Sequence, residues 1–395
     1  MIPANVERRA RWVLDSIGAT ELGFGDDVPY DAAAWEQVER GERPAGDELA
    51  DAFFHLARVE ERNAPRDEHG RFRAEWSCLD PLDPPLERLR RTLGLVDPTF
   101  TVALTHDVDS PWRWTRIGLR GAAARLKRNT LEGRLAPALR EATALAAAPV
   151  HRARGTDPNW RFRHIVEEER RRGASGSTFF VLAGHNDPHD GAAPDAYETL
   201  RPRLVETIRT AGAEVGLHGS YTAADDPVRL ADEKATLVAL AGDVQGHRYH
   251  YLRADPHRNV AQLATLGFRY DTTLGFPDAV GFRAGIARPF RPWDFERGAP
   301  ADLLEIPLAA MDATLAEERY LGLSAKRAEP RLTALLDWAA ANGGAFAILW
   351  HPDRFDPLTS GGWDRLYSRL LDGIRERGGV CMSAGELSSH STWSK

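Results

Sequence analysis

Residues 101–109 place an imidazole and two carboxylates directly after a short apolar run. The β-branched and aliphatic residues before His106 predict a buried strand over residues 100–105. Two carboxylates as close as Asp107 and Asp109 need a cation, a proton or good solvation, so they suit metal binding or general base catalysis. The simpler alternative is an Asp that caps the next turn. The Asp-Val-Asp pattern beside a histidine favours the chemical role.

Reactive side chains follow five of the strands that the sequence predicts. They are His106, Asp107 and Asp109; His218; His247, Arg248, His250 and Arg253; Asp271; and His351. A lone histidine at one strand end is more often structural, but the carboxyl ends of parallel strands converge on one mouth. Such a set suits hydrolysis. One group takes a proton from water, a cation holds the oxyanion, and a second imidazole protonates the leaving group.

Strand-like and helix-like segments alternate from residue 100 onward. The expected strands are 100–105, 177–182, 214–217, 249–252, 268–270, 303–306, 345–350 and 380–382. The expected helices are 161–172, 197–211, 227–241, 259–266, 330–342 and 363–377. This alternation predicts an α/β fold with a parallel sheet, either a barrel or a doubly wound sheet.

The bulk composition is that of an ordinary soluble protein. Of 395 residues, 43% are hydrophobic and 28% are charged. Lys plus Arg number 51 and Asp plus Glu number 58, and this net charge of −7 argues against a general nucleic-acid binder. The two cysteines, Cys78 and Cys381, could form one bond, but their number indicates neither a disulfide framework nor a thiolate zinc site. We find neither a secretory signal pattern nor an apolar run of about 18 residues, so the cytoplasm is the expected compartment.

Two segments stand apart from the alternating pattern. Residues 1–98 are expected to form an α-rich N-terminal extension, and residues 99–395 the main domain. Residues 111–155 are a basic insertion, in which positions 113–154 carry ten Lys or Arg and two acidic residues. A basic amphipathic helix can lie on anionic lipid or engage an anionic partner, which makes peripheral membrane contact one interpretation. The other is an insertion whose positive face is simply solvated.

The order of these motifs resembles that of the polysaccharide deacetylases, the NodB-homology fold of carbohydrate esterase family four. Residues 105–109 resemble the first motif, residues 177–181 the second strand, and residues 216–218 the histidine motif. Residues 248–251 lie where the family has an Arg followed by an aromatic residue, and residues 349–352 resemble the last motif. Residues 51–54 and 67–72 resemble an N-terminal extension found in a bacterial subgroup.

The resemblance implies a distorted (β/α) barrel of the glycoside hydrolase and deacetylase type, and removal of an N-acyl group, most simply N-acetyl, from a sugar or glycoconjugate. By position, Asp107 is the general base, Asp109 and His218 are metal ligands, Arg248 orients the base and His351 is the general acid. The residues expected to bind the carbohydrate at the mouth are Tyr221, His250, Tyr251, Arg253 and Trp350. The implied cofactor is a divalent metal, zinc in the first instance.

One departure from the family pattern affects the metal. The family has a second histidine four residues after the first, and here that position is Thr222. A catalytic zinc site usually has three protein ligands and water, whereas Asp109 and His218 supply two. His106 or His250 could substitute, or Ser220 and Thr222 could hold water. Two alternatives therefore stay open: a metal-independent hydrolase of a small cyclic amide, and a catalytically degenerate carbohydrate-binding domain.

Overall fold

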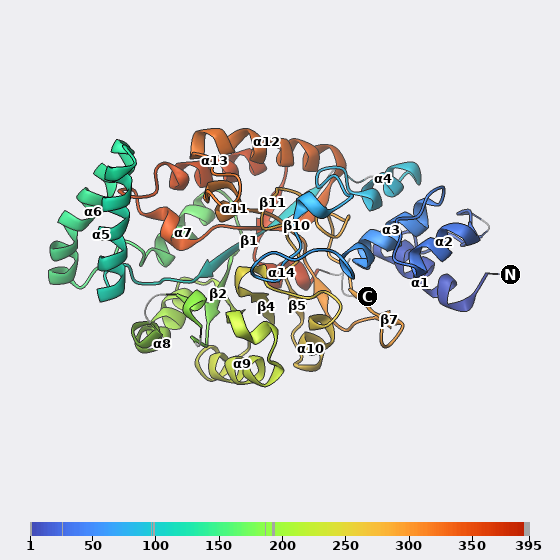
Figure 1. Ribbon diagram of the computed structural model, residues 1–395, viewed down its shortest axis with the longest axis horizontal. Coiled ribbons are helices and arrows are strands. Elements are labelled where there is room, and N and C mark those ends of the chain that lie inside the picture. Colours follow the sequence, from blue (N-terminus) through green and yellow to red (C-terminus); the bar gives the residue numbers. More distant parts are fainter. Residues whose placement is uncertain are drawn as a thin grey trace.

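A curled parallel sheet forms the centre of the molecule (Figure 1). The computed structural model describes residues 2–25, 27–95, 97, 99–185, 187–191 and 194–390, with side chains for all of these except 194 and 195. Along the sheet the strand order is β8-β5-β4-β3-β2-β1-β10-β9, and β11 pairs with β1 from outside this path. All pairings in the sheet are parallel. The predicted distorted (β/α) barrel is thereby confirmed as a half-barrel.

The strands and the helices that cover them alternate along the chain. The strands are β1 (Phe100–Val108), β2 (Thr178–Leu182), β3 (Glu214–Gly219), β4 (Gly246–Tyr249), β5 (Tyr270–Asp271), β8 (Leu304–Glu305), β9 (Leu308–Met311), β10 (Gly344–Leu349) and β11 (Val380–Met382). The helices are α7 (Phe162–Arg171), α8 (Pro194–Thr210), α9 (Pro227–Ala241), α10 (Asn259–Thr265), α11 (Asp312–Ala316), α12 (Ala325–Asn342), α13 (Trp363–Glu376) and α14 (Ala384–Ser388). A small hairpin, β6 (Trp293–Asp294) and β7 (Ala299–Pro300), lies apart from the sheet.

The central strand β1 is buried on both faces, as its continuous apolar sequence predicts. Val102 and Leu104 pack into the cluster that includes the covering helices, while Ala103 belongs to a separate cluster with Phe180 and Tyr270. Alternate side chains thus point to opposite faces of the sheet. The same alternation places Asp107 on one face and its neighbours in the sequence on the other.

Two differences from the predicted elements concern the sheet. The expected strand 249–252 is wrong, because β4 ends at Tyr249 and His250–Leu252 form a 3₁₀ turn, η5. Tyr251 and Leu252 have φ of 61° and 53°, a left-handed conformation that stops a strand. Strand β9 was not predicted, since its four residues are too short and too alanine-rich to show a pattern.

The N-terminal layer is a group of helices at one end of the half-barrel (Figure 1). It contains α1 (Ala4–Ser16), α2 (Ala32–Glu39), α3 (Glu48–Leu56) and α4 (Pro85–Thr92). Its hydrophobic cluster includes Trp12, Trp35 and Phe53, and continues into Trp293 of the main domain. A buried ion pair between Glu61 and Arg283, 2.7 Å long, adds a polar link. The division of the chain at residue 98 stays a prediction, and residues 98 and 391–395 lie outside the described part.

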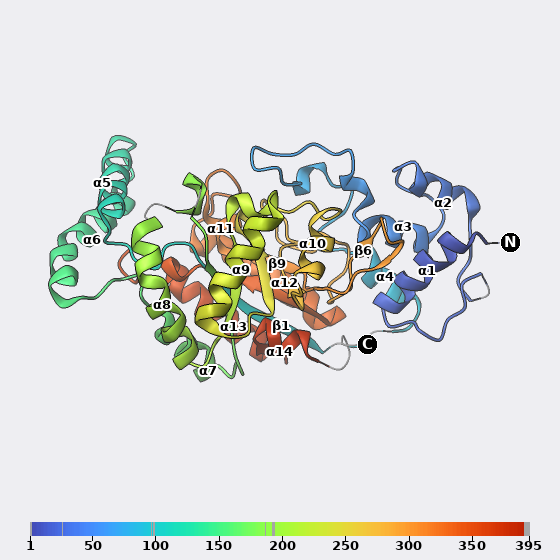
Figure 2. The same cartoon turned by 90° about the horizontal axis from the view of Figure 1, so that it is seen from below.

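The basic insertion forms two antiparallel helices that project away from the half-barrel (Figures 1 and 2). They are α5 (Arg116–Leu131) and α6 (Leu135–Arg154). Small residues, Ala122, Ala144 and Ala148, pack between them beside Trp114. Among the residues described, no helix has the length and apolar character needed to cross a bilayer.

A fully buried histidine, His55, sits between two carboxylates in the N-terminal layer. Its Nε2 lies 3.5 Å from Asp51 Oδ1 and its Nδ1 lies 3.6 Å from Glu60 Oε1. Burial alone would lower the pKa of His55, but Asp51, Cys78 and Glu60 raise this pKa to about 10. His55, Glu60 and Cys78 are close enough to share a metal. Glu60 nevertheless already accepts hydrogen bonds from Arg58 and from the Ser77 hydroxyl, so an imidazolium ion accounts for the cluster.

Replacing His55 by glutamine is expected to lower the free energy of unfolding by roughly 3 kcal/mol at pH 6 and by much less at pH 10. Because the folded-state pKa lies above the unfolded value of 6.5, the stabilisation is complete below pH 6.5 and is lost as the pH rises through about 10. Denaturant titrations of both proteins across this range measure the difference. An equal loss at both pH values would assign His55 a packing role instead.

Candidate active site

Four strands deliver the reactive side chains to one mouth of the half-barrel. Asp107 and Asp109 come from the end of β1, His218 from β3, His250 from the turn after β4, and His351 from the end of β10. Parallel strands bring their carboxyl ends to the same edge, which explains the convergence. Four of the five predicted clusters therefore meet, as expected from the sequence. In the remaining cluster, Asp271 pairs with His247 instead, and Asp271 Oδ1 lies 2.8 Å from His247 Nδ1.

Asp109 lies at the centre of this group. Its Oδ1 is 3.3 Å from His218 Nε2 and 3.5 Å from His250 Nε2, and its Oδ2 is 3.5 Å from His351 Nε2. Asp107 Oδ2 lies 3.6 Å from His218 Nε2. One carboxylate is thus surrounded by three imidazoles, with a second carboxylate beside them.

Asp109, His218 and His250 are arranged as a candidate metal centre. One ligand atom from each lies within 4.8 Å of the other two. The buried atoms Asp109 Oδ1 and His218 Nε2 have no hydrogen-bond partner, although such atoms usually do. A divalent cation would satisfy both. These residues therefore fit the metal that the motifs imply, with His250 in place of the absent second histidine.

Hydrogen bonds at the far side of each ring fix the nitrogen that faces the centre. His218 Nδ1 donates to the backbone carbonyl of Arg248 over 3.0 Å. His250 Nδ1 lies 3.0 Å from Asp190 Oδ1. A carbonyl or carboxylate can only accept, so the proton of each neutral ring is on Nδ1 and the lone pair is on Nε2. Outer partners of this kind orient histidine ligands in metal sites.

The other predicted substitutes for the missing histidine lie elsewhere. His106 Nδ1 bonds to the backbone carbonyl of Trp350 over 2.7 Å, and its Nε2 lies 2.8 Å from Glu169 Oε1. Both nitrogens are engaged, and the ring stacks on Phe179 away from the mouth. Ser220 donates its hydroxyl to Glu233, and Thr222 lies in the short helix η4 (Tyr221–Ala224).

Asp107 is held by a buried guanidinium. Arg248 Nη1 donates to Asp107 Oδ1 over 2.8 Å, and Arg248 Nε donates to the Thr272 carbonyl over 3.1 Å. The guanidinium also lies over the Phe180 ring, 4.6 Å from its centroid. These contacts fix the carboxylate and balance its charge, which leaves Asp107 Oδ2 facing the mouth. Arg248 is therefore placed to position Asp107.

His351 is placed as a proton donor on the other side of Asp109. Its Nδ1 lies 2.6 Å from Asp312 Oδ1, so its Nε2 is directed to the mouth. Burial alone would lower the pKa of His351, but the charges of Asp312, Asp109 and Asp107 raise this pKa to about 10. The ring therefore carries a proton at neutral pH.

Asp109 and His250 shift each other's pKa in opposite directions. Partial burial would raise the pKa of Asp109, yet His250, His218 and His351 together hold this pKa well below its usual range. Burial would lower the pKa of His250, whereas Asp109 and Asp190 raise it to about 9. Asp109 is thus an anion at neutral pH, which is the form that binds a cation.

The predicted substrate-binding residues divide into two groups. Tyr251 and His250 line a cavity of about 160 Å³ together with Asp107, Asp109 and His351. Arg253 donates instead to the backbone carbonyls of His69 and Tyr221, which holds the loops together. Trp350 is 1% exposed, and its ring packs against Trp363 and Tyr367.

The last predicted binding residue, Tyr221, lies beside the mouth rather than in its lining. Its hydroxyl lies 3.1 Å from His69 Nδ1, and its ring stacks on His189 with centroids 4.2 Å apart. The structure therefore does not bring Tyr221, Arg253 or Trp350 into the lining of the small cavity.

Several residues of the mouth were missed by the sequence reasoning. Asp190 and Asp312 orient His250 and His351, but neither belongs to a motif that marks this role. Arg71 reaches the cavity from the N-terminal layer and donates to the Tyr251 carbonyl over 3.1 Å. The only sequence signal for Arg71 was the resemblance of residues 67–72 to a deacetylase-associated extension.

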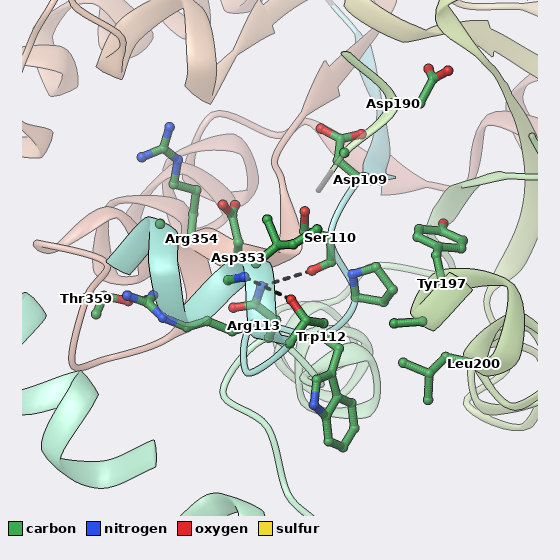
Figure 3. A pocket seen from close by; sticks show the side chains of 18 of the residues that line it. Asp109, Ser110, Trp112, Arg113, Asp190, Tyr197, Leu200, Asp353, Arg354 and Thr359 are labelled. Atoms are coloured by element: carbon green, nitrogen blue, oxygen red, sulfur yellow. Dashed lines mark hydrogen bonds between the residues drawn. The ribbon is translucent and has the colours of Figure 1, made fainter. Parts of the chain in front are cut away.

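A second, larger cavity of about 460 Å³ extends from Asp109 toward the start of α5 (Figure 3). In Figure 3, Asp109 and Asp190 lie at one end and Trp112 at the other. Arg113 and Thr359 form part of its lining. This space has both polar and apolar lining and offers room for a ligand that is larger than the acyl group alone.

Replacing Asp190 by asparagine is expected to weaken metal binding by about 10–100-fold, as for other outer-shell changes. The amide retains the size of the carboxylate but can turn its NH₂ group toward His250 Nδ1, which would favour the wrong tautomer. Competition with a chelator of known affinity measures the change. Asp187→Asn is the matched control, because Asp187 lies in the same loop and pairs with the more exposed His189. Unchanged affinity in Asp190→Asn would contradict His250 as a ligand.

Comparison with known proteins gives fold similarities. No protein-family model and no curated sequence matches the chain. Its structure is similar to one assigned as a polysaccharide deacetylase from Mycobacterium smegmatis, with a TM-score of 0.46, 17% identity, and coverage of 74% of this chain and 90% of that one. A protein with the same assignment from Pseudomonas aeruginosa PAO1 gives a TM-score of 0.42, 15% identity, and coverage of 58% and 71%.

The 4-alpha-glucanotransferase from Thermococcus litoralis gives a TM-score of 0.40 at 16% identity, and the match covers 74% of this chain and 38% of that one. At these identities the similarities are distant and concern the fold alone. The sheet topology makes the chain an α/β half-barrel protein, and its structure is distantly similar to proteins assigned as polysaccharide deacetylases.

Proposed function

We propose that this protein is a metal-dependent hydrolase that removes an N-acyl group, most simply N-acetyl, from a sugar or glycoconjugate. The observation that carries the proposal is the trio Asp109, His218 and His250, whose ligand atoms converge between Asp107 and His351. Amide hydrolysis needs a base for water and an acid for the leaving amine. The mouth offers Asp107 as the candidate base on one side of the candidate metal centre and His351 as the candidate acid on the other.

Each residue has a distinct part in this proposal. Asp109, His218 and His250 hold a divalent cation, which when bound polarises the amide carbonyl and makes water more acidic. Asp107, fixed by Arg248, takes a proton from the attacking water. His351 donates its Nε2 proton to the nitrogen of the scissile amide as the carbon–nitrogen bond breaks. Water adds one hydroxyl to the acyl carbon and one hydrogen to the amine, so the products are a carboxylate and a free amino sugar.

The larger cavity supports a carbohydrate as the substrate class. It is lined by charged and hydroxyl side chains such as Arg113, Asp353 and Thr359, which suit the hydroxyl groups of a sugar. Trp112 offers an aromatic surface at its rim. The acyl group would enter the small cavity, and the sugar would extend into the larger one.

Acetate release from a panel of N-acetylated sugars and glycoconjugates tests the proposal with the purified full chain. We expect release that stops after metal removal by a chelator and returns when zinc, cobalt or nickel is added back. Activity that survives complete metal removal would point to the metal-independent hydrolase. Sugar binding without turnover, in protein shown to contain one equivalent of metal, would point to a binding domain.

A further inference from the structure

The hairpin of α5 and α6 exposes an unusual number of large apolar side chains. Nine large hydrophobic residues are exposed in the described part of the chain, and five of them lie on this hairpin. They are Ile117, Leu131, Leu135, Leu139 and Val150. Alanines and the partly buried Leu119 and Leu145 form the internal packing of the hairpin, whereas the large apolar side chains at its tip are turned outward. This is the reverse of what packing of an isolated hairpin would favour.

The exposed leucines form a ridge at the tip of the hairpin. Leu131 ends α5 and Leu135 begins α6, and Leu139 follows one helical turn later. Their exposed fractions are 77%, 79% and 69%. Residues four apart in a helix share a face, so Leu135 and Leu139 present their side chains together.

The same hairpin carries positive charge that the protein does not neutralise. Its two acidic residues are already paired, Glu141 with Arg113 and Arg125, and Glu132 with Arg134. Six exposed cations make no ion pair with any described residue: Arg116, Arg120, Lys127, Arg128, Arg152 and Arg154. The whole chain has a net charge of −7. Attraction to an anionic surface therefore needs a local excess of positive charge, and this hairpin supplies one.

We propose that the α5–α6 hairpin docks the protein on an anionic lipid bilayer. The leucine ridge enters the boundary between headgroups and acyl chains, and the surrounding arginines and Lys127 contact the lipid phosphates. Neither helix has the character of a membrane span, so the hairpin lies at the surface. The hairpin lies at the edge of the molecule (Figures 1 and 2), and although Arg134 near its tip pairs with Glu318 of the main domain, the three leucines stay exposed and can reach a membrane.

The position of the hairpin also relates it to the candidate active site. Trp112, Ile117 and Gly118 at the base of α5 line the larger cavity that begins at Asp109. A docked hairpin would hold this cavity near the bilayer. In combination with the proposed function, on which this step rests, the geometry favours a glycoconjugate presented at a membrane surface as the substrate.

Vesicle co-sedimentation of the full chain tests the docking. The probes are vesicles of phosphatidylcholine alone and vesicles that also contain phosphatidylglycerol. We expect binding to the anionic vesicles that weakens as salt is raised, because screening reduces the attraction of surface charges. The triple variant Leu131→Asp, Leu135→Asp, Leu139→Asp and the variant Arg116→Glu, Arg120→Glu, Lys127→Glu should each lower the partition coefficient at least tenfold.

Matched controls separate docking from general effects of these changes. Val228→Asp and Leu358→Asp introduce the same charge at exposed apolar positions outside the hairpin and should bind like the parent. Circular dichroism and thermal unfolding verify that each variant is folded. Binding needs no turnover, so its outcome is independent of the proposed reaction.

Three results would overturn the proposal. The first is no binding of folded parent protein to anionic vesicles at low salt. The second is binding to anionic vesicles that the leucine variant retains, together with equally strong binding of the parent to heparin. This pair of results would show attraction to polyanions in general. The third is self-association of the parent that the leucine variant abolishes, which would assign the ridge to a second copy of the chain.

Discussion

Replacing Asp107 by asparagine is expected to lower the rate of amide hydrolysis by about 10²–10⁴-fold while the metal content stays at one equivalent per chain. The change keeps the shape of the side chain and removes the oxygen that takes the proton from water. Asp107 is not among the three residues whose ligand atoms converge, so metal binding should persist. Acetate release and elemental analysis of the same preparation provide the two measurements.

Two controls accompany the Asp107 variant. Asp302→Asn makes the same change at an exposed carboxylate outside the cavities described and should leave most of the activity. The stability of Asp107→Asn must be measured as well, because the fully buried Arg248 loses a charged partner. Near-parent turnover by a folded Asp107→Asn protein would rule out Asp107 as the base.

The second large effect is expected for His250. Replacement by alanine should reduce the metal content from one equivalent to near zero and lower turnover more than 100-fold, since two protein ligands remain. Elemental analysis after gel filtration measures the first effect, and the acetate assay measures the second. His218→Ala should behave in the same way.

The matched control for His250→Ala is His189→Ala. His189 also lines the small cavity but pairs with Asp187 at a more exposed position. It should retain the metal. If His250→Ala keeps a full equivalent while His218→Ala loses it, the third ligand lies elsewhere and the role of His250 returns to substrate binding.

Local sequence patterns were sufficient to predict a parallel α/β sheet and the edge of this sheet at which the candidate site lies. Buried parallel strands have continuous apolar runs, and each reactive cluster directly follows such a run, so the mouth was predictable without long-range information. Asp107 and Asp109 are two residues apart and share a face of β1, whereas His106 points to the opposite face. Alternation along β1 thus explains why His106 pairs with Glu169 behind the sheet.

The boundary of β4 shows the limit of that reasoning. The aromatic residues after Arg248 resemble a strand, but the chain turns at His250, with left-handed backbone at Tyr251 and Leu252. Such a turn depends on contacts with distant segments, for example the hydrogen bond from Arg71 to the Tyr251 carbonyl. The spacing of apolar residues along the sequence contains no information about these contacts.

The sequence by itself determined a parallel sheet and the mouth at its carboxyl edge, because both follow from residues close together in the chain. The curl of the sheet and the candidate base and acid were implied by the family resemblance. Only the tertiary structure decided which imidazole lies beside Asp109 and His218 in the candidate metal centre. His218 lies on β3 and His250 directly follows the neighbouring strand β4, and their orientation depends on the Arg248 carbonyl and on Asp190. The structure likewise decided which side of the basic insertion is exposed, because two helices must pack before one face is left free.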